Sequence, residues 1–400
     1  MRVRIWTVFM VLAAAVSLTS CTWMYMDSDD TAHIEAKRSI RPFSHLKEPI
    51  VVTMPVYSNR HLFGNKSWDS MQDQKGDIFV VIDLATDTVW DWIFFPGKHG
   101  WTNWRCVEAG SSPTLYCSAG MGSGLVGCLD PTKTTLDVYN AGTKDVVRSY
   151  STPGDHIIIP DDYYDQGAET LVYRINSFNV RMGRMEGSVE VPTDSIGYFD
   201  HPQADPEGNY WFAYPFNDEN CIRMYDVSTN TLGDIVVKLP VWVKNISTNY
   251  ICHVDHVDAK YIIGSYCKAG AEPNLNQQLF LIDRKQGWEP TYISIPDELD
   301  SISYFYETVE INGKYYGIHP NEIREGYIPQ VHLSEIDLEK KEIHKVATVD
   351  IDMTETVYVR GSRLYLMKSR NISDIYYTYY DFATGETGRM VNIKYEDVVK

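Results

Sequence analysis

The stretch Asp77-Ile-Phe-Val-Val-Ile-Asp-Leu84 decides the fold, because it is a short run of β-branched and aromatic residues that ends at a turn. Ala85-Thr-Asp-Thr88 supplies the turn, and residues 89–95 are again rich in β-branched and aromatic side chains. Two such runs joined by a short polar turn indicate neighbouring strands of an antiparallel hairpin. The stretch therefore predicts one strand–turn–strand unit of a β-sheet.

The same unit recurs along the chain, each time with an aspartate at the end of its first strand. The aspartates of the five units are Asp83, Asp226, Asp283, Asp337 and Asp381. Successive aspartates lie 143, 57, 54 and 44 residues apart. Because the first gap is close to three times the others, we expect two degenerate units inside it, around residues 125–147 and 170–185.

Seven units with a period of roughly 40 to 50 residues predict an all-β fold, a β-propeller of seven four-stranded blades. Six blades, or a pair of β-sandwiches, are the alternatives. The stretch Asp205-x-x-Gly-x-x-Trp211 resembles the turn and aromatic strand of several propellers of bacterial envelope proteins. Residues 48–56 are expected to close the ring by pairing with the last blade.

The repeated aspartates are interpreted as fold determinants. A carboxylate at a strand end can accept hydrogen bonds from backbone N–H groups one or two residues further on. A catalytic acid would be needed once or twice, whereas this aspartate occurs in five units. We therefore expect these five side chains to hold turns.

Residues 1–20 have the features of a signal peptide. Arg2 and Arg4 precede an uncharged apolar run, residues 5–16, which is shorter than the roughly 20 residues of a membrane-spanning helix. Leu18-Thr-Ser-Cys21 follows and resembles the lipobox of bacterial lipoproteins. The resemblance implies cleavage before Cys21 and the attachment of diacylglycerol and an acyl chain such as palmitate, which would anchor the protein to a membrane.

Residues 21–47 have no periodic pattern and are interpreted as a tether to a propeller-like domain of residues 48–400. Thr22 stands where an inner-membrane lipoprotein has aspartate. We therefore expect the protein to be located in the cell envelope, with the outer membrane favoured. The acidic residues Asp27, Asp29 and Asp30 are either a surface-export signal or a solvated linker, which leaves the periplasmic face and the cell surface open.

The charge of the chain limits its partners. Its net charge is −18, and removal of the two arginines of the signal peptide brings it near −20. Such a surface repels nucleic acid, which is therefore not expected as a partner. The expected partners are the membrane, through the lipid, and a protein or glycan of the envelope.

No motif predicts a catalytic residue, a cofactor or a complete metal site. The stretch His253-Val-Asp-His-Val-Asp258 has the composition of a metal site. Side chains alternate along a strand, so His253 and Asp255 should face one way while His256 and Asp258 face the other. This stretch could still bind an ion if it supplied two of the ligands and another blade supplied the rest.

Three tryptophans, Trp101, Trp104 and Trp211, are candidates for stacking on a sugar ring. Packing between blades is the commoner role of such side chains. With His253 and Asp255 they make up the candidate ligand-binding residues of the chain.

Beyond the lipidated cysteine six cysteines remain, an even number in an exported chain. Cys106 and Cys117 lie symmetrically about one predicted turn, and Cys252 and Cys267 about another. Such residues are directly opposite in an antiparallel hairpin, within disulfide range. Both pairs are predicted as disulfides, but a bulge at Gly264 would shift the second pair out of register. Six buried thiols are the alternative.

Two functions of different classes fit this sequence. The first is a membrane-anchored binding or scaffold module for an envelope protein or glycan. The second is a propeller enzyme, a hydrolase or lyase acting on glycans at the central channel. We favour binding, because neither a nucleophile nor a metal set can be assembled from the sequence.

Overall fold

The computed structural model describes the chain from residue 39 onward, with gaps. The described residues are 39–57, 74–96, 105–108, 115–118, 125–140, 150–151, 154–165, 170–192, 203–216, 219–240, 252–268, 276–296, 299, 307–320, 330–351, 356–371, 374–394 and 398. The signal peptide and Cys21 lie outside them. Among these residues, no helix is both long enough and apolar enough to cross a membrane.

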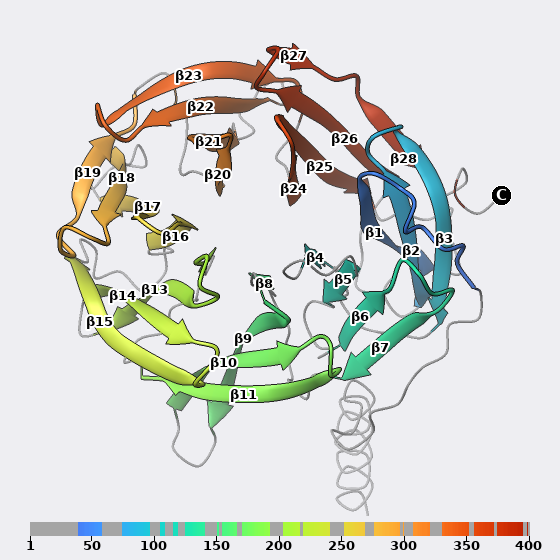
Figure 1. Ribbon diagram of the computed structural model, residues 1–400, viewed down its shortest axis with the longest axis horizontal. Coiled ribbons are helices and arrows are strands. Elements are labelled where there is room, and N and C mark those ends of the chain that lie inside the picture. Colours follow the sequence, from blue (N-terminus) through green and yellow to red (C-terminus); the bar gives the residue numbers. More distant parts are fainter. Residues whose placement is uncertain are drawn as a thin grey trace, which may run out of the picture. The chain divides into compact units, whose positions relative to one another are not determined.

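Strands make up almost all of this described part, which is all-β (Figure 1). The strands pair into seven antiparallel sheets. The chain divides into two compact units. The first comprises Met1–Ser149, Ile159–Tyr163 and Phe178–Glu186, and the second comprises Tyr150–Ile158, Tyr164–Ser177 and Gly187–Lys400.

Three sheets are formed by the N-terminal half of the chain. The first is β1 (Pro49–Tyr57), β2 (Gln74–Asp83) and β3 (Thr88–Pro96). The second is β4 (Arg105–Glu108), β5 (Leu115–Ser118), β6 (Leu125–Leu129) and β7 (Leu136–Asn140). The third is β8 (Tyr150–Ser151), β9 (His156–Asp165), β10 (Thr170–Asn179) and β11 (Arg184–Val191), and it contributes residues to both units.

Four further sheets belong to the second unit. They are β12 (Gln203–Ala204), β13 (Tyr210–Phe216), β14 (Glu219–Asp226) and β15 (Thr231–Pro240); then β16 (Cys252–Val257), β17 (Tyr261–Lys268), β18 (Asn276–Asp283) and β19 (Thr291–Ser294). The next is β20 (Glu307–Ile311), β21 (Lys314–Pro320), β22 (Val331–Asp337) and β23 (Glu342–Val349). The last is β24 (Thr356–Arg360), β25 (Arg363–Asn371), β26 (Asp374–Asp381), β27 (Glu386–Thr387) and β28 (Val391–Lys394).

Two details differ from the expected set of uniform four-stranded blades. The β1–β3 sheet has three strands, and the β24–β28 sheet has five because β27 and β28 both pair with β26. Residues 49–57 pair with β2, with Pro49 opposite Asp83, rather than with the final sheet. The number of blades that close one ring stays a prediction.

Apolar side chains fill the space between consecutive sheets of the second unit. Trp211 and Ile222 of the β12–β15 sheet pack with Val254 and Phe280 of the next sheet. Similar clusters join the β16–β19 sheet to the β20–β23 sheet and the latter to the β24–β28 sheet. One sheet cannot cover both of its own faces, so each is buried by its neighbours, as in a propeller.

The predicted role of the repeated aspartates is confirmed. Each of the five carboxylates accepts a hydrogen bond from the backbone N–H group two residues further on, at 2.8 to 3.3 Å. Two further units share this turn. Asp130 accepts from the N–H of Thr132 at 2.9 Å, and Asn179 accepts from that of Arg181 at 3.0 Å. These two residues mark the degenerate units that were expected between Asp83 and Asp226.

Candidate functional site

A bulge in β16 decides which of its side chains face the next sheet. His253 pairs with Ser265 of β17, and Val254 pairs with Gly264, but His256 pairs with Ile263. One additional residue therefore stands in β16 between Val254 and His256. Residues 263 and 265 lie on one face of β17 because they are two apart, so their partners His253 and His256 share that face as well. The expected alternation, with these two histidines on opposite faces, is wrong for this reason.

This face of the β16–β19 sheet is turned toward the β20–β23 sheet. The ring of His256 packs edge-on against Tyr315 of β21, with centroids 5.4 Å apart. Gly317, two residues further along β21, pairs with Thr308 on one side and with Ser334 on the other. Thr308 and Ser334 therefore lie on the face of their sheet that carries Tyr315.

The layer between these two sheets is polar in its inner half, which includes β16 and β20. Figure 1 shows β16 and β20 on the inner side of their sheets, with β19 and β23 on the outer side. Seven polar side chains of this layer are less than 9% exposed: His253, Asp255, Ser265, Thr308, His319, His332 and Ser334. The outer half of the same layer is apolar. A buried polar layer is costly unless its groups are hydrogen-bonded, so each group calls for a partner.

Asp255 is the most unusual group of this layer. Its side chain is 3% exposed, and its Oδ2 atom has no hydrogen-bond partner among the described residues. Burial raises the pKa of Asp255 well above its usual value, the charge of Glu307 raises it further, and Ser265 opposes the shift. The Oγ1 atom of Thr308 is also buried without a partner in the part of the chain that the structure covers. Burial therefore favours the protonated form of Asp255, and the same layer contains the unused hydroxyl group of Thr308.

Two histidines in the same sheet as Thr308 are satisfied. His319 Nε2 lies 2.7 Å from Ser334 Oγ, and His332 Nδ1 lies 3.0 Å from Thr348 Oγ1. Burial, followed by the charges of His332 and Lys345, lowers the pKa of His319 to about 3. His319 is therefore a neutral hydrogen-bonding group of the layer.

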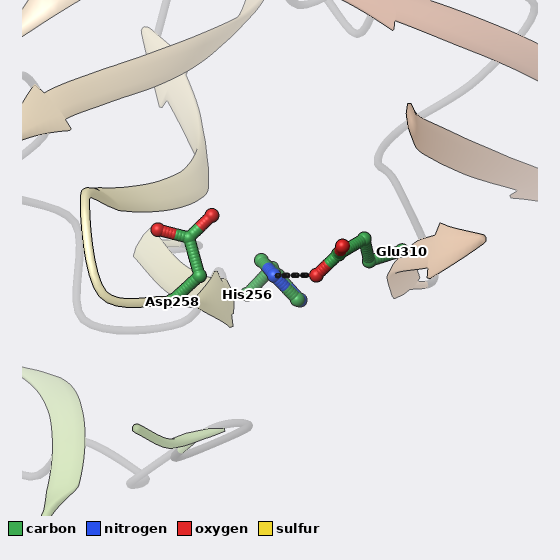
Figure 2. A group of neighbouring side chains, drawn as sticks. All are labelled: His256, Asp258 and Glu310. Carbon is green, nitrogen blue, oxygen red and sulfur yellow. Dashed lines mark ion pairs between the residues drawn. The ribbon is translucent and has the colours of Figure 1, made fainter. Parts of the chain in front are cut away.

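A second group of side chains lies where β16 ends (Figure 2). His256, Asp258 and Glu310 each offer one ligand atom, and the three atoms lie within 4.8 Å of one another. His256 Nε2 lies 3.8 Å from Glu310 Oε2. The Oδ1 atom of Asp258 accepts the backbone N–H groups of Lys260 and Tyr261, each at 2.6 Å.

The protonation states of this group follow from its surroundings. Burial lowers the pKa of His256, although the charges of Asp258 and Glu310 act in the opposite direction. Burial would raise the pKa of Asp258, but hydrogen bonds from the Tyr315 hydroxyl and two backbone N–H groups outweigh it and hold that pKa below its usual value. The group thus offers a neutral imidazole beside an ionised carboxylate at neutral pH.

Trp211 is not an exposed sugar platform. It is 3% exposed, its ring stacks on Trp288 at 5.6 Å, and its Nε1 atom donates to Asp205 Oδ2 at 2.9 Å. Arg284 of the neighbouring sheet donates to the same oxygen at 3.1 Å. Trp211 and Asp205 therefore join two sheets. Trp101 and Trp104 lie outside the described residues.

The bulge also changes the predicted disulfides. It places Cys252 opposite Tyr266 instead of Cys267, and Cys252 is present as a buried thiol, so the predicted Cys252–Cys267 bridge is wrong. Cys106 lies directly opposite Cys117, as their spacing predicts. The register thus allows the Cys106–Cys117 bridge, which stays a prediction.

Sequence reasoning missed the residues that the β20–β23 sheet contributes, namely Glu307, Thr308, Glu310 and Tyr315. They lie about fifty residues beyond β16 in the chain, and no local motif marks them. The strongest local signal was the turn Asn312-Gly313, whose residues have φ angles of 54° and 76°. That turn fixes the hairpin on which all four residues lie.

Comparisons with known proteins identify the fold. No protein-family model matches the chain, and no curated protein matches it. A putative 6-phosphogluconolactonase from Bacteroides uniformis has 11% identity and a TM-score of 0.52, over 87% of this chain and 97% of that one. The β-propeller domain of the Trilobed protease from Pyrococcus furiosus has 12% identity and a TM-score of 0.50, over 91% and 98% of the two chains.

Puromycin hydrolase has 11% identity and a TM-score of 0.52, and the match covers 90% of this chain and 54% of that one. Identities this low show the fold alone. The chain is therefore a β-propeller protein, and its activity has to be inferred from its own side chains.

Proposed function

We propose that this protein is a lipoprotein of the cell envelope, anchored through Cys21, whose propeller binds a hydroxyl-rich ligand such as an envelope glycan. The observation that carries the choice of ligand is the polar layer around Asp255 and Thr308. Their Oδ2 and Oγ1 atoms are buried and have no partner among the described residues. Unsatisfied buried groups are expected where a ligand or water completes the hydrogen bonding.

The chemistry of the layer favours a neutral ligand over a charged one. A protonated carboxyl group and a hydroxyl group both donate and accept hydrogen bonds, as sugar hydroxyl groups do. The net charge of −18 disfavours anionic ligands, nucleic acid included. A glycan therefore fits the layer better than a phosphorylated or acidic partner.

Glycan binding is tested with the full chain purified in detergent and titrated with solubilised peptidoglycan. Thr308→Val removes the unused hydroxyl group at nearly constant volume, and we expect affinity to fall about fivefold, the equivalent of one hydrogen bond. Thr378→Val is the matched control: Thr378 lies in the β24–β28 sheet, away from this layer, is 2% exposed, and its hydroxyl donates to the Gly388 carbonyl. Equal affinities of wild type and Thr308→Val would contradict the proposal. If the protein captured an envelope protein and bound no glycan, the ligand would be a protein instead of a glycan.

The membrane anchor is tested separately. Cys21→Ser should abolish labelling by a radioactive or clickable fatty acid and release the protein from the membrane fraction. A mutant that still partitions into detergent as the wild type does would remove the lipoprotein assignment. The outer membrane is the proposed location, and density-gradient fractionation of the wild type tests it.

A glycan-processing hydrolase or lyase is the second candidate, and one observation favours it. Burial raises the pKa of Asp255 well above its usual value, and the charge of Glu307 raises it further. A neutral acid near a second carboxylate is the arrangement by which glycosidases divide acid and base roles. Turnover of a chromogenic glycoside that both Asp255→Asn and Glu307→Gln abolish would favour this candidate over simple binding.

A further inference from the structure

We propose that His256, Asp258 and Glu310 form a binding site for a divalent transition-metal ion, with Zn²⁺ as the best match. The site departs from the sequence-based expectation of no metal site in this chain. Two of its ligands, His256 and Asp258, come from β16 and the turn after it, and the third, Glu310, comes from β20 of the next sheet (Figure 2).

The geometry of the three side chains is close to that of a metal site. Their ligand atoms all lie within 4.8 Å of one another, and His256 Nε2 and Glu310 Oε2 are 3.8 Å apart. Two ligand atoms bound at about 2.1 Å to one tetrahedral ion lie about 3.4 Å apart. The side chain of Glu310 is 42% exposed, so rotation about its side-chain bonds can close the remaining distance.

The donor set selects the class of metal. His256 Nε2 is buried and makes no hydrogen bond to any described residue. An imidazole nitrogen with two carboxylates suits zinc and its first-row neighbours, whereas Ca²⁺ and Mg²⁺ prefer oxygen ligands alone. Three protein ligands leave a fourth position for water or for a group of a bound molecule.

The surroundings hold two of the ligands in place. The Tyr315 hydroxyl donates to Asp258 Oδ2, while the two backbone N–H groups hold Oδ1, so the carboxylate cannot rotate away. Each carboxylate oxygen keeps a lone pair for a metal. Tyr315 also packs edge-on against the imidazole ring. Such outer-shell contacts are typical of metal sites, where they orient the ligands.

A bound ion would connect two neighbouring sheets. His256 and Asp258 belong to the β16–β17 hairpin, and Glu310 belongs to β20. Metal binding should therefore stabilise the folded protein, by an amount that grows with the logarithm of the ion concentration once that concentration exceeds the dissociation constant. This gives a second measurement besides direct titration.

The experiment is competition of the full, untagged chain in detergent with a chromophoric zinc chelator. We expect the wild type to bind Zn²⁺ at this site, and both His256→Gln and Glu310→Gln to weaken that binding at least tenfold. Glu310 is exposed, so its variant keeps the test valid if His256→Gln does not fold. Tyr315→Phe should weaken binding about tenfold, as outer-shell changes do, without removing a ligand.

The matched control is His344→Gln. His344 Nε2 lies 3.1 Å from Glu342 Oε2 on β23, but both side chains are more than half exposed. This pair reproduces a histidine–glutamate contact outside the three-residue group, so its variant should bind Zn²⁺ as the wild type does and show the same zinc-dependent rise in melting temperature. Loss of binding in His344→Gln alone, or unchanged binding in both His256→Gln and Glu310→Gln, would overturn the proposal.

Discussion

Two buried aspartates on neighbouring sheets have opposite surroundings. Asp205, at the end of β12, is 0% exposed and accepts hydrogen bonds from Asn209, Trp211 and Arg284, the last from the next sheet. Asp255, in β16, is 3% exposed, yet its Oδ2 atom has no partner among the described residues. One layer between sheets thus contains a fully paired carboxylate and the next contains an acid with an unused oxygen.

The difference separates a structural carboxylate from a candidate functional one. A buried charge is tolerated when its partners compensate for lost hydration, as Arg284 and Trp211 do for Asp205. The Oδ2 atom of Asp255 lacks such compensation, so burial raises the pKa of this carboxyl group, and the atom keeps unused hydrogen-bonding capacity. We infer that the first layer serves stability and the second serves ligand binding.

Removal of the paired carboxylate should have the largest effect. Asp205→Ala leaves Arg284 without its buried partner, and we expect it to lower the free energy of unfolding by about 3 to 5 kcal/mol. The measurement is urea unfolding followed by tryptophan fluorescence. Asp226→Ala, which removes only a turn carboxylate, is the control and should cost about 1 kcal/mol. Similar losses in the two variants would show that Asp205 is not a special support of its layer.

A comparison of the two hairpins that contain cysteines, one regular and one with a bulge, tests the effect of the bulge on disulfide formation. Cys106 and Cys117 are directly opposite in a regular hairpin, so we expect a disulfide that adds about 2 to 4 kcal/mol to stability. Cys252 should stay a thiol, because the bulge places it opposite Tyr266. Peptide mapping without reduction, on protein taken from the envelope, measures both. Alkylatable thiols at Cys106 and Cys117 would contradict the first expectation, and a Cys252–Cys267 peptide would contradict the register.

The bulge itself is tested at Gly264. A Cβ atom there would lie 2.0 Å from Phe280 Cζ and 2.2 Å from the His253 carbonyl oxygen, so ring and backbone would both have to shift. Gly264→Ala should therefore cost about 1 to 3 kcal/mol and disturb the zinc affinity of His256 on the paired strand β16. Gly233→Ala is the control, because its nearest neighbour would be 3.6 Å away. An unchanged Gly264→Ala variant would mean that the bulge does not need glycine.

The fold could be predicted from the sequence because its signals are local. An aspartate followed by a polar turn repeats at nearly constant spacing, and each occurrence makes the same backbone hydrogen bond. The two degenerate units were placed by arithmetic alone. They escaped direct recognition because Asp130 is followed by proline and because Asn179 replaces aspartate.

The candidate site could not be predicted because it depends on one inserted residue and on a contact between sheets. Strict alternation would separate His253 from His256, whereas the bulge opposite Gly264 brings both to one face. Glu310 and Tyr315 then come from a hairpin about fifty residues away. The composition of the stretch 253–258 pointed to the candidate site, but the geometry of that site could be found only from the strand register.

The most direct test of the contrast is the pH dependence of unfolding of Asp255→Asn relative to the wild type. The pKa of Asp255 is raised in the folded protein, so above about pH 4 the folded state keeps a proton that the unfolded state has released. Stability of the wild type therefore falls as pH rises through this window, whereas asparagine cannot ionise. The account predicts that Asp255→Asn gains up to about 1.4 kcal/mol per pH unit relative to the wild type, from about pH 4 up to the raised pKa. A pH-independent loss of stability in Asp255→Asn would contradict it.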